Sequence, residues 1–304
     1  TIADFRRDNG AGLKQVCRAF VLFCNEARLL GQEVAVDGSK FRAAASKDQV
    51  VTRSQLEKRR AAVDRQVEQY LQELEAADSR QEHTVKREHV EAALEQLTEE
   101  RAALDLDDQA MRAEGKSQHC RTEPEARLMR SGRNGSVLGY NIQSVVETAH
   151  KLIVHHEVTQ SGGDNRLLYP MAREAKAVLG QDRLTVLADA GYSSGEHLQR
   201  CDDDGITALV PPNRAVNNTA SGGHYQRAVF VYEPSKDAYR CPAGEWLRHK
   251  TFSSKNQVHL YTTDACASCH LRSNCTSADR RWVSRHFHEA AFERSAERLR
   301  QDRG

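Results

Sequence analysis

Two short runs share one pattern: Glu33-Val34-Ala35-Val36-Asp37-Gly38 and Leu184-Thr185-Val186-Leu187-Ala188-Asp189-Ala190-Gly191. Each is apolar, rich in β-branched residues, and ends in an aspartate with a glycine directly after it or one residue later. Apolar runs of this length that end at a turn signal predict buried strands. A carboxylate at the carboxyl end of such a strand lies where open α/β sheets place their active sites.

The two aspartates have two interpretations. Side by side, Asp37 and Asp189 would offer oxygen ligands to hard divalent cations, as two-metal phosphoryl transfer requires. Alternatively, each carboxylate caps the turn that follows its strand, which is a common role of aspartate before glycine. The occurrence of two such runs in one chain leaves both interpretations open.

The composition excludes some classes of protein. The chain has 304 residues, enough for one large domain with insertions or for two domains. Charged residues make up 29% and the mean hydropathy is -0.70, which predicts exposed, highly charged helices. A net charge of +1 gives no global basic field. Without a signal peptide or an apolar run of roughly 18 residues, we expect a cytoplasmic protein with no membrane partner.

The spacing of apolar residues predicts the order of the elements. Helices are expected before the first strand, and a long antiparallel helical hairpin, with a structural or dimer-forming role, is expected after it. A strand hairpin, a helix, the strand ending at Asp189, another helix and a fifth strand follow. This order predicts an α/β, ribonuclease H-like mixed sheet. In that topology the first and fourth strands are neighbours, so Asp37 and Asp189 would lie side by side.

Four of the eight cysteines fall in the irregular segment after the fifth strand: Cys241, Cys266, Cys269 and Cys275. A Cys-x-x-Cys pair with two further thiols nearby suits tetrahedral Zn²⁺, and His270 is an alternative ligand. The metal would fold a zinc-ribbon-like insert that is too poor in apolar residues to form its own core. The alternatives are a redox pair or unconnected thiols.

Basic residues and two tryptophans, Trp246 and Trp282, surround these cysteines. Such a combination can hold a phosphate backbone or form a solvated face, and both interpretations stay open. The basic residues are Arg240, Arg248, His249, Lys250, Lys255, Arg272, Arg280, Arg281, Arg285 and His286.

With these features the chain resembles a known family, the bacterial insertion-sequence DDE transposases. The family group has a helical hairpin after the first aspartate and a cysteine-rich insert after the fifth strand. The resemblance covers essentially the whole chain. The matching segments are Thr1–Arg7, Val36-Asp37-Gly38-Ser39-Lys40, Ala44-Ala45-Ser46-Lys47, Glu125–Met129, Gly139-Tyr140-Asn141-Ile142-Gln143, Ala188–Ser194, Cys241-Pro242-Ala243-Gly244 and Ser284–Glu289.

The resemblance implies metal-dependent phosphodiester cleavage and strand transfer during transposition of an insertion sequence. Asp37 and Asp189 would be two catalytic acids that hold Mg²⁺ or Mn²⁺, with Tyr192 packed beside them. Lys40, Lys47 and Arg285 would contact DNA. The implied partners are double-stranded DNA, at element ends and at the target, and a second copy in a full-length homodimer, in a bacterial cytoplasm.

The chain departs from the family at the third acid. The family carries a glutamate in a Glu-His-Pro-Phe-Gly type motif, and nothing here matches it. Glu289, Glu293 and Glu297 resemble the stretch before that motif. Both ends of the sequence fall within helical patterns, so we expect an inactive fragment whose third acid lies beyond the chain end. The alternative is a non-catalytic, zinc-bearing remnant that binds nucleic acid.

These patterns predict five parts of the chain. They are an N-terminal helical segment (1–30), the catalytic core (31–50 and 120–213), the helical hairpin (51–119), the cysteine-rich insert (214–280) and the start of a C-terminal helical region (281–304).

Overall fold

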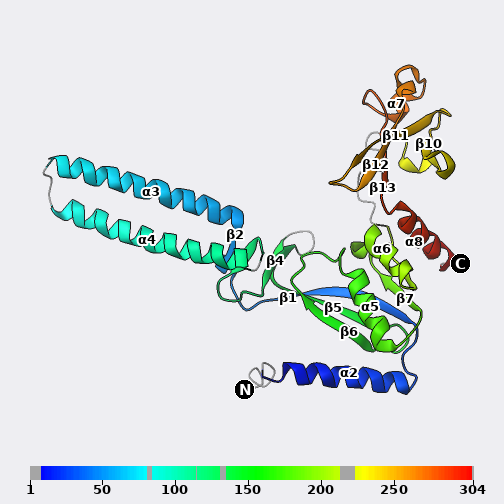
Figure 1. Ribbon diagram of the computed structural model, residues 1–304, viewed down its shortest axis with the longest axis horizontal. Helices are drawn as coiled ribbons and strands as arrows, with labels where there is room; N and C mark the ends of the chain where they lie inside the picture. The colour runs from blue at the N-terminus through cyan, green and yellow to red at the C-terminus, as the bar shows by residue number, and fades with distance from the viewer. Residues whose placement is uncertain (1–7, 81–83, 114, 131–134, 213–222, 303–304) are drawn as a thin grey trace. The chain divides into compact units, whose positions relative to one another are not determined.

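The computed structural model describes residues 8–80, 84–113, 115–130, 135–212 and 223–302 (Figure 1). Within these ranges the protein is mixed α/β, with one sheet of six strands, one of five and one of two. The chain divides into two compact units, which we call the first and the second unit. The first contains Thr1–Asp37, Gln143–Glu157 and Asp164–Gly304, and the second contains Gly38–Ile142 and Val158–Gly163.

The six-stranded sheet has the order β4-β5-β1-β7-β8, and β6 also pairs with β5. Strand β1 is parallel to β7, and β7 is parallel to β8. The prediction that the first and fourth predicted strands are neighbours is therefore confirmed. The strands are β1 (Glu33–Arg42), β4 (Arg127–Arg130), β5 (Ser136–Glu147), β6 (Ile153–Thr159), β7 (Leu184–Ala188) and β8 (Ile206–Leu209).

Strands β1 and β5 run in opposite directions. The amide of Thr148 donates to the carbonyl of Glu33, and the hydroxyl of Ser144 donates to the carbonyl of Asp37. Partners on β5 thus fall in number as those on β1 rise, which is the pattern of an antiparallel pair. A mixed sheet of this order is consistent with the predicted ribonuclease H-like transposase fold.

The core of the first unit follows the alternation of its strands. Val34 on β1 and Val186 on β7 are both 0% exposed, and the apolar faces of four helices join them in one cluster. Burial of such side chains is the main stabilising contribution, about 1.5–3 kcal/mol each. The helices are α2 (Gly10–Glu26), α5 (Leu168–Leu179), α6 (Gly195–Asp203) and α8 (Glu289–Asp302).

Helix boundaries in this unit match the local signals. Helix α5 ends at Gly180, which has φ of 62° and a left-handed cap conformation that glycine adopts without strain. Among the helices in the described ranges, none is both long enough and apolar enough to span a membrane.

The second unit contains the two long helices expected after the first strand, α3 (Arg53–Arg80) and α4 (Thr84–Ala113), which lie alongside each other in Figure 1. Arg60 pairs with Asp105, whereas Arg101 pairs with Asp64. These crossed partners show that the helices are antiparallel. Strands β2 (Val50–Thr52) and β3 (Gln118–Cys120) pair at the base of the helices.

The cysteine-rich segment forms a five-stranded antiparallel sheet of order β13-β12-β11-β10-β9. The predicted end of this insert at residue 280 is too early. Strand β13 pairs with β12, and its Val283 lies in the small core beside Tyr261. The elements are β9 (Val231–Glu233), β10 (Ala238–Arg240), β11 (Trp246–Ser253), β12 (Val258–Thr262), α7 (Arg272–Cys275) and β13 (Val283–His286).

Candidate active site

Asp37 and Asp189 directly follow residues that are paired between β1 and β7. The parallel register joins Val34 to Val186 and Val36 to Ala188. The two aspartates are the next residues on adjacent strands, which lie about 4.8 Å apart, so both fall on the same side of the sheet. Both residues are exposed. The register therefore brings the two aspartates to neighbouring positions in the sheet despite the long intervening sequence.

The predicted end of the first strand at Asp37 is wrong. Strand β1 continues to Arg42, whereas the pairing with β7 stops at Val36 and Ala188. The reason is that β1 has a second neighbour, β5, which is 12 residues long. Asp37 therefore lies within a strand, at the position where one of its two neighbours ends.

Asp189 also has the turn role that the sequence left open. Its carboxylate Oδ1 accepts a hydrogen bond of 2.8 Å from the amide of Gly191. This bond caps the short 3₁₀ turn from Ala190 to Tyr192. The turn directs Tyr192 into the core, where it is 1% exposed. The turn-capping and cation-binding interpretations are therefore compatible, because the hydrogen bond that caps the turn uses one of the two carboxylate oxygens.

A third acidic residue, Asp164, belongs to this region and was missed by sequence reasoning. The side-chain amide of Gln143 donates to Asp164 Oδ1 at 2.9 Å, and the hydroxyl of Tyr192 donates to Gln143 Oε1. Asp164 follows a Ser-Gly-Gly turn, so its sequence context indicates only a loop. The signal that could have identified it is Gln143, a polar residue at a position of β5 that alternation places in the core.

The charges of these acids affect the phenol of Tyr192. Burial is the main reason that the pKa of Tyr192 lies well above its usual value, and the negative charges of Asp164, Asp37 and Asp189 raise it further. Tyr192 is linked to Asp164 through Gln143, and it lies on the turn that Asp189 caps. Tyr192 stays a neutral hydrogen-bond donor at neutral pH.

The three glutamates on α8 are each engaged in an ion pair. Glu289 is buried and pairs with Arg227, Nη1 to Oε1, at 2.9 Å. Glu293 pairs with Arg285 at 2.9 Å, and Glu297 with Arg300 at 2.7 Å. Of the three carboxylates, Glu289 alone is buried, and those of Glu293 and Glu297 are more than half exposed.

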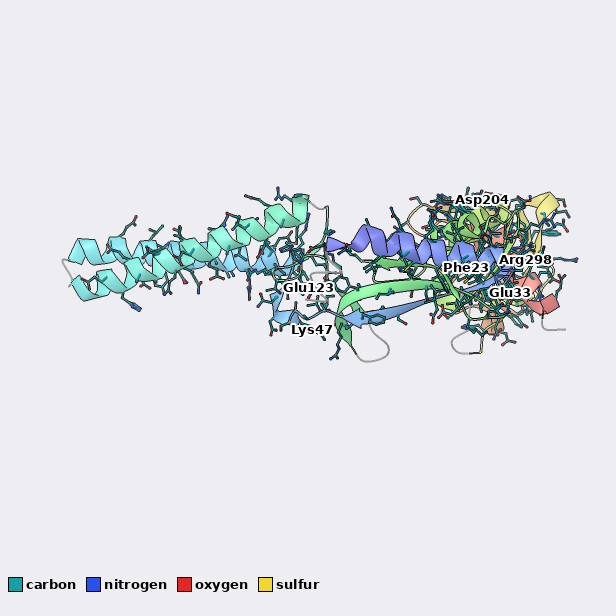
Figure 2. All side chains as sticks on the ribbon, turned by 90° about the horizontal axis from the view of Figure 1, so that it is seen from below. Phe23, Glu33, Lys47, Glu123, Asp204 and Arg298 are labelled. Atoms are coloured by element: carbon teal, nitrogen blue, oxygen red, sulfur yellow. The ribbon has the colours of Figure 1, made fainter. Side chains whose placement is uncertain are left out.

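The three predicted DNA contacts have different surroundings. Lys40 Nζ donates to the carbonyl of Arg130, and Lys47 is exposed in the short turn after β1, where Figure 2 labels it. Arg285 pairs with Glu293, and its guanidinium lies 3.9 Å from the centre of the Tyr232 ring. Burial lowers the pKa of Arg285, but its hydrogen bonds to Glu293 and Tyr239 outweigh this and raise it. The positive charge of Arg285 therefore interacts mainly with groups of the protein itself.

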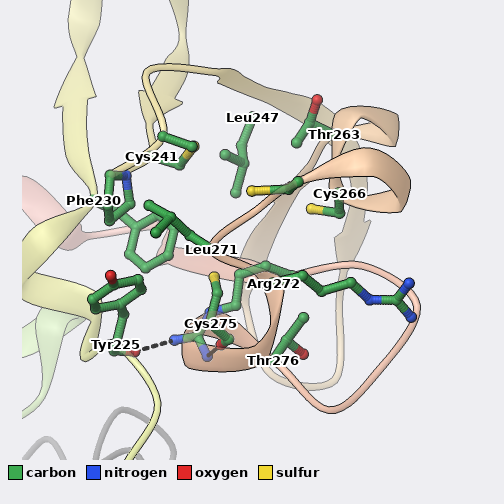
Figure 3. Close-up of a pocket in the computed structure, with 14 residues that line it drawn as sticks. Tyr225, Phe230, Cys241, Leu247, Thr263, Cys266, Leu271, Arg272, Cys275 and Thr276 are labelled. Atoms are coloured by element: carbon green, nitrogen blue, oxygen red, sulfur yellow. Dashed lines mark hydrogen bonds between the residues drawn. The ribbon is translucent and has the colours of Figure 1, made fainter.

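The four predicted zinc ligands line one cavity of about 20 Å³. Figure 3 shows Cys241, Cys266 and Cys275 on separate segments around it, beside Leu247 and Leu271. Burial raises the pKa of the Cys275 thiol, and the neighbouring cysteines raise it further. The sequence predicted that the insert has no core of its own, and this prediction is wrong. Three tyrosines of its sheet pack in mutual contact.

The arrangement of the possible ligand side chains bears on metal binding. Across the part of the chain that the structure describes, no three His, Cys, Asp or Glu side chains form a group that could hold a metal ion. The predicted zinc site is therefore not confirmed, although its four thiols share a cavity. The pair Asp37 and Asp189 fits the donor set of Mg²⁺, which proteins usually bind through one or two carboxylates, with water and substrate phosphates as the other ligands.

Comparison with known proteins shows the family of this chain. The family model described as a transposase DDE domain matches residues 98–296, about two thirds of the chain. The matched range contains Asp189 and Asp164 but not Asp37. No curated protein matches the chain significantly.

One solved structure was found, a piggyBac transposase synaptic complex with hairpin DNA. It is 9% identical, with a TM-score of 0.26, and the similarity covers 55% of this chain and 30% of that chain. So low a structural score adds nothing to the assignment, which rests on the family model alone. The chain belongs to the family of proteins that carry the transposase DDE domain.

Proposed function

We propose that this chain acts in DNA transposition through metal-dependent cleavage and transfer of phosphodiester bonds, with Asp37 and Asp189 as two of the catalytic acids. The observation that carries the proposal is the parallel register of β1 and β7, which makes these aspartates neighbours at one edge of the sheet. Membership of the DDE family supports the reaction class.

The carboxylates of Asp37 and Asp189 would hold Mg²⁺ or Mn²⁺, which when bound activates a water or hydroxyl nucleophile and neutralises charge on the phosphate. Asp189 is oriented for this by its bond to the Gly191 amide, which fixes one carboxylate oxygen. Tyr192 anchors the same turn in the core. The protein therefore supplies a rigid pair of acids at an exposed edge, where a DNA backbone can approach.

A metal titration tests this role without requiring catalysis. We expect the 304-residue chain to bind Mn²⁺, as measured by electron paramagnetic resonance. The tightest Mn²⁺ site should be lost in the Asp37→Asn and Asp189→Asn variants. Glu297→Gln is the matched control, since that carboxylate is exposed and paired on α8. Unchanged affinity in both aspartate variants would refute the assignment.

The proposed partner is double-stranded DNA, held partly by Lys47 and Lys40. Lys47→Ala should weaken binding to a duplex and reduce the slope of log affinity against log salt by about 0.9, the loss of one phosphate contact. Lys58→Ala, on the exposed surface of α3, is the control. Equal effects of the two variants would remove Lys47 from the interface. The homodimer expected of the full-length protein stays a prediction.

A structural Zn²⁺ at Cys241, Cys266, Cys269 and Cys275 is the second part of the proposal. Its support is that all four thiols line one cavity, of about 20 Å³, which is about the space of a single water-sized sphere. Cys266→Ser and Cys275→Ser should lower the zinc content of the purified chain, whereas Cys17→Ser, an exposed cysteine on α2, should not. Zinc content that is equally low in all four proteins would contradict the metal site.

The alternative function is a zinc-bearing remnant that binds nucleic acid without catalysis. The two functions differ in their dependence on the aspartates. A remnant would bind DNA and zinc normally, but Asp37→Asn and Asp189→Asn would leave its Mn²⁺ binding unchanged.

A further inference from the structure

The loop between β6 and α5 reaches the same edge of the sheet as Asp37. Strand β5 is antiparallel to β1, and β6 pairs with β5 after a short turn. Strand β6 therefore runs in the direction of β1 and β7, and the carboxyl ends of all three point to one edge. Asp164 lies on the loop that leaves β6 at this edge, shortly before α5.

Gln143 fixes the position of Asp164. Its side chain is 0% exposed, although it is a polar amide on a strand whose neighbouring inward position holds Val145. A buried amide without partners would cost about 1–3 kcal/mol, so its hydrogen bonds determine its place. Gln143 accepts from the Tyr192 hydroxyl and donates to Asp164 Oδ1. One side chain thus joins the turn after Asp189 to the carboxylate of Asp164.

Asp164 lies near the metal-binding pair but outside a direct ligand group. Its Oδ1 accepts from Gln143, Gln143 accepts from the Tyr192 hydroxyl, and Tyr192 lies on the turn that Asp189 caps. Within the described residues, however, the three carboxylates do not form a group of three metal ligands. This geometry suits an outer carboxylate, which attracts the cation electrostatically and accepts hydrogen bonds from its bound water.

We propose that Gln143 is a positioning residue that holds Asp164 as a third, outer carboxylate beside the Asp37–Asp189 pair, where it strengthens the binding of a divalent cation. The inference rests on the proposed function, because it assigns Asp164 to the same site. It goes beyond that function by adding a negative charge and its buried support, which a list of catalytic acids does not contain.

The test measures Mn²⁺ affinity of the full chain by electron paramagnetic resonance. Asp164→Asn keeps the acceptor for Gln143 and removes only the charge, and we expect the affinity to fall about tenfold, as for other outer-shell partners. Gln143→Met removes the hydrogen bonds to Asp164 and Tyr192 and should cause a similar loss. Asp182→Asn, an exposed carboxylate between α5 and β7, is the control and should bind like the parent protein.

The double variant separates positioning from general damage. If Gln143 acts through Asp164, the combination of Gln143→Met and Asp164→Asn should bind Mn²⁺ no more weakly than either single variant. Additive losses would overturn the positioning role. Should Gln143→Met fail to fold, Tyr192→Phe, which loses one hydroxyl bonded to Gln143, takes its place in the same cycle.

The outcomes distinguish this inference from the proposed function. Loss of Mn²⁺ binding in Asp37→Asn with affinity within twofold of the parent in Asp164→Asn would overturn the inference alone. Unchanged binding in Asp37→Asn and Asp189→Asn would overturn the proposed function and the inference with it. Weaker binding in all three variants, with normal binding in Asp182→Asn, would support both.

Discussion

Substitution of Glu289 by glutamine tests whether the first glutamate of α8 is a structural residue or a functional acid. Its Oε1 lies 2.9 Å from Arg227 Nη1, and the two side chains are 6% and 12% exposed. Its Oε2 accepts from the amide of His286 at 3.0 Å. Arg227 also donates to the Tyr239 hydroxyl at 2.9 Å. Glutamine keeps the shape and one acceptor but leaves the guanidinium without its counter-charge.

The size of the effect follows from this burial. Removal of one partner from a buried ion pair costs about 3–5 kcal/mol, because the other charge is left uncompensated. Two features place Glu289→Gln at the lower end, about 3 kcal/mol. The amide oxygen can still accept one hydrogen bond, and a cavity of about 310 Å³ lined by Arg227 and Glu289 allows water to approach. A loss of this size corresponds to a fall in melting temperature of about 6–12 °C.

Urea unfolding followed by circular dichroism measures this change, with Glu297→Gln as the matched control. Glu297 pairs with Arg300 on the surface, where its side chain is 53% exposed, and its loss should change the free energy of unfolding by less than about 0.5 kcal/mol. The reasoning is refuted if Glu289→Gln is as stable as the control. A stable variant that also loses Mn²⁺ affinity would instead identify Glu289 as a metal-binding acid.

Two further predictions concern the second unit and the cap of α5. Burial and the hydrogen bond to Glu123 raise the pKa of Tyr140 to about 12, above its value of about 10 in an unfolded chain. The neutral phenol therefore stabilises the fold below pH 10, and this contribution is lost as the pH rises from about 10 to 12. Absorbance at 295 nm should show one late-titrating tyrosine fewer in Tyr140→Phe, and an unchanged titration would contradict the assignment. Alanine at Gly139 would place its Cβ 1.8 Å from the carbonyl oxygen of Phe41 and should destabilise the chain by about 3 kcal/mol. Alanine at Gly180 meets no atom within 4 Å but must adopt φ of +62°, so it should cost only about 1–2 kcal/mol. The reverse order in thermal unfolding would refute the close approach at Gly139.

Elements with strong local signals were predictable from the sequence. Helix α5 has its apolar face and its terminal glycine within a single stretch, and α6 and the helix pair α3 and α4 follow the spacing of their apolar residues. Five of the six strands of the largest sheet were predicted for the same reason, whereas β4 (Arg127–Arg130) was not predicted as a strand. Strand β13 was not, because Ser284 to His286 has no apolar alternation and becomes a strand only through pairing with β12.

The candidate site was predictable only in part. Asp37 and Asp189 are visible because each follows an apolar strand, and the order of elements indicates that these strands are neighbours. Arg285 looked like a free cation for DNA, because the sequence does not show that its guanidinium pairs with Glu293, eight residues later on α8. Asp164 was missed because its loop reaches the site only through Gln143, on a different strand.

The sequence by itself determined which residues are apolar and at what spacing, and this spacing indicates the helices and strands. It also determined that an aspartate directly follows the last paired residue of β1 and of β7. The tertiary structure alone decided which charges are neutralised, which thiols share a cavity and which loop approaches the acids. The physical reason is range: helix and strand periodicity act between near neighbours in the chain. Ion pairs, buried hydrogen bonds and strand register join residues that only folding brings together.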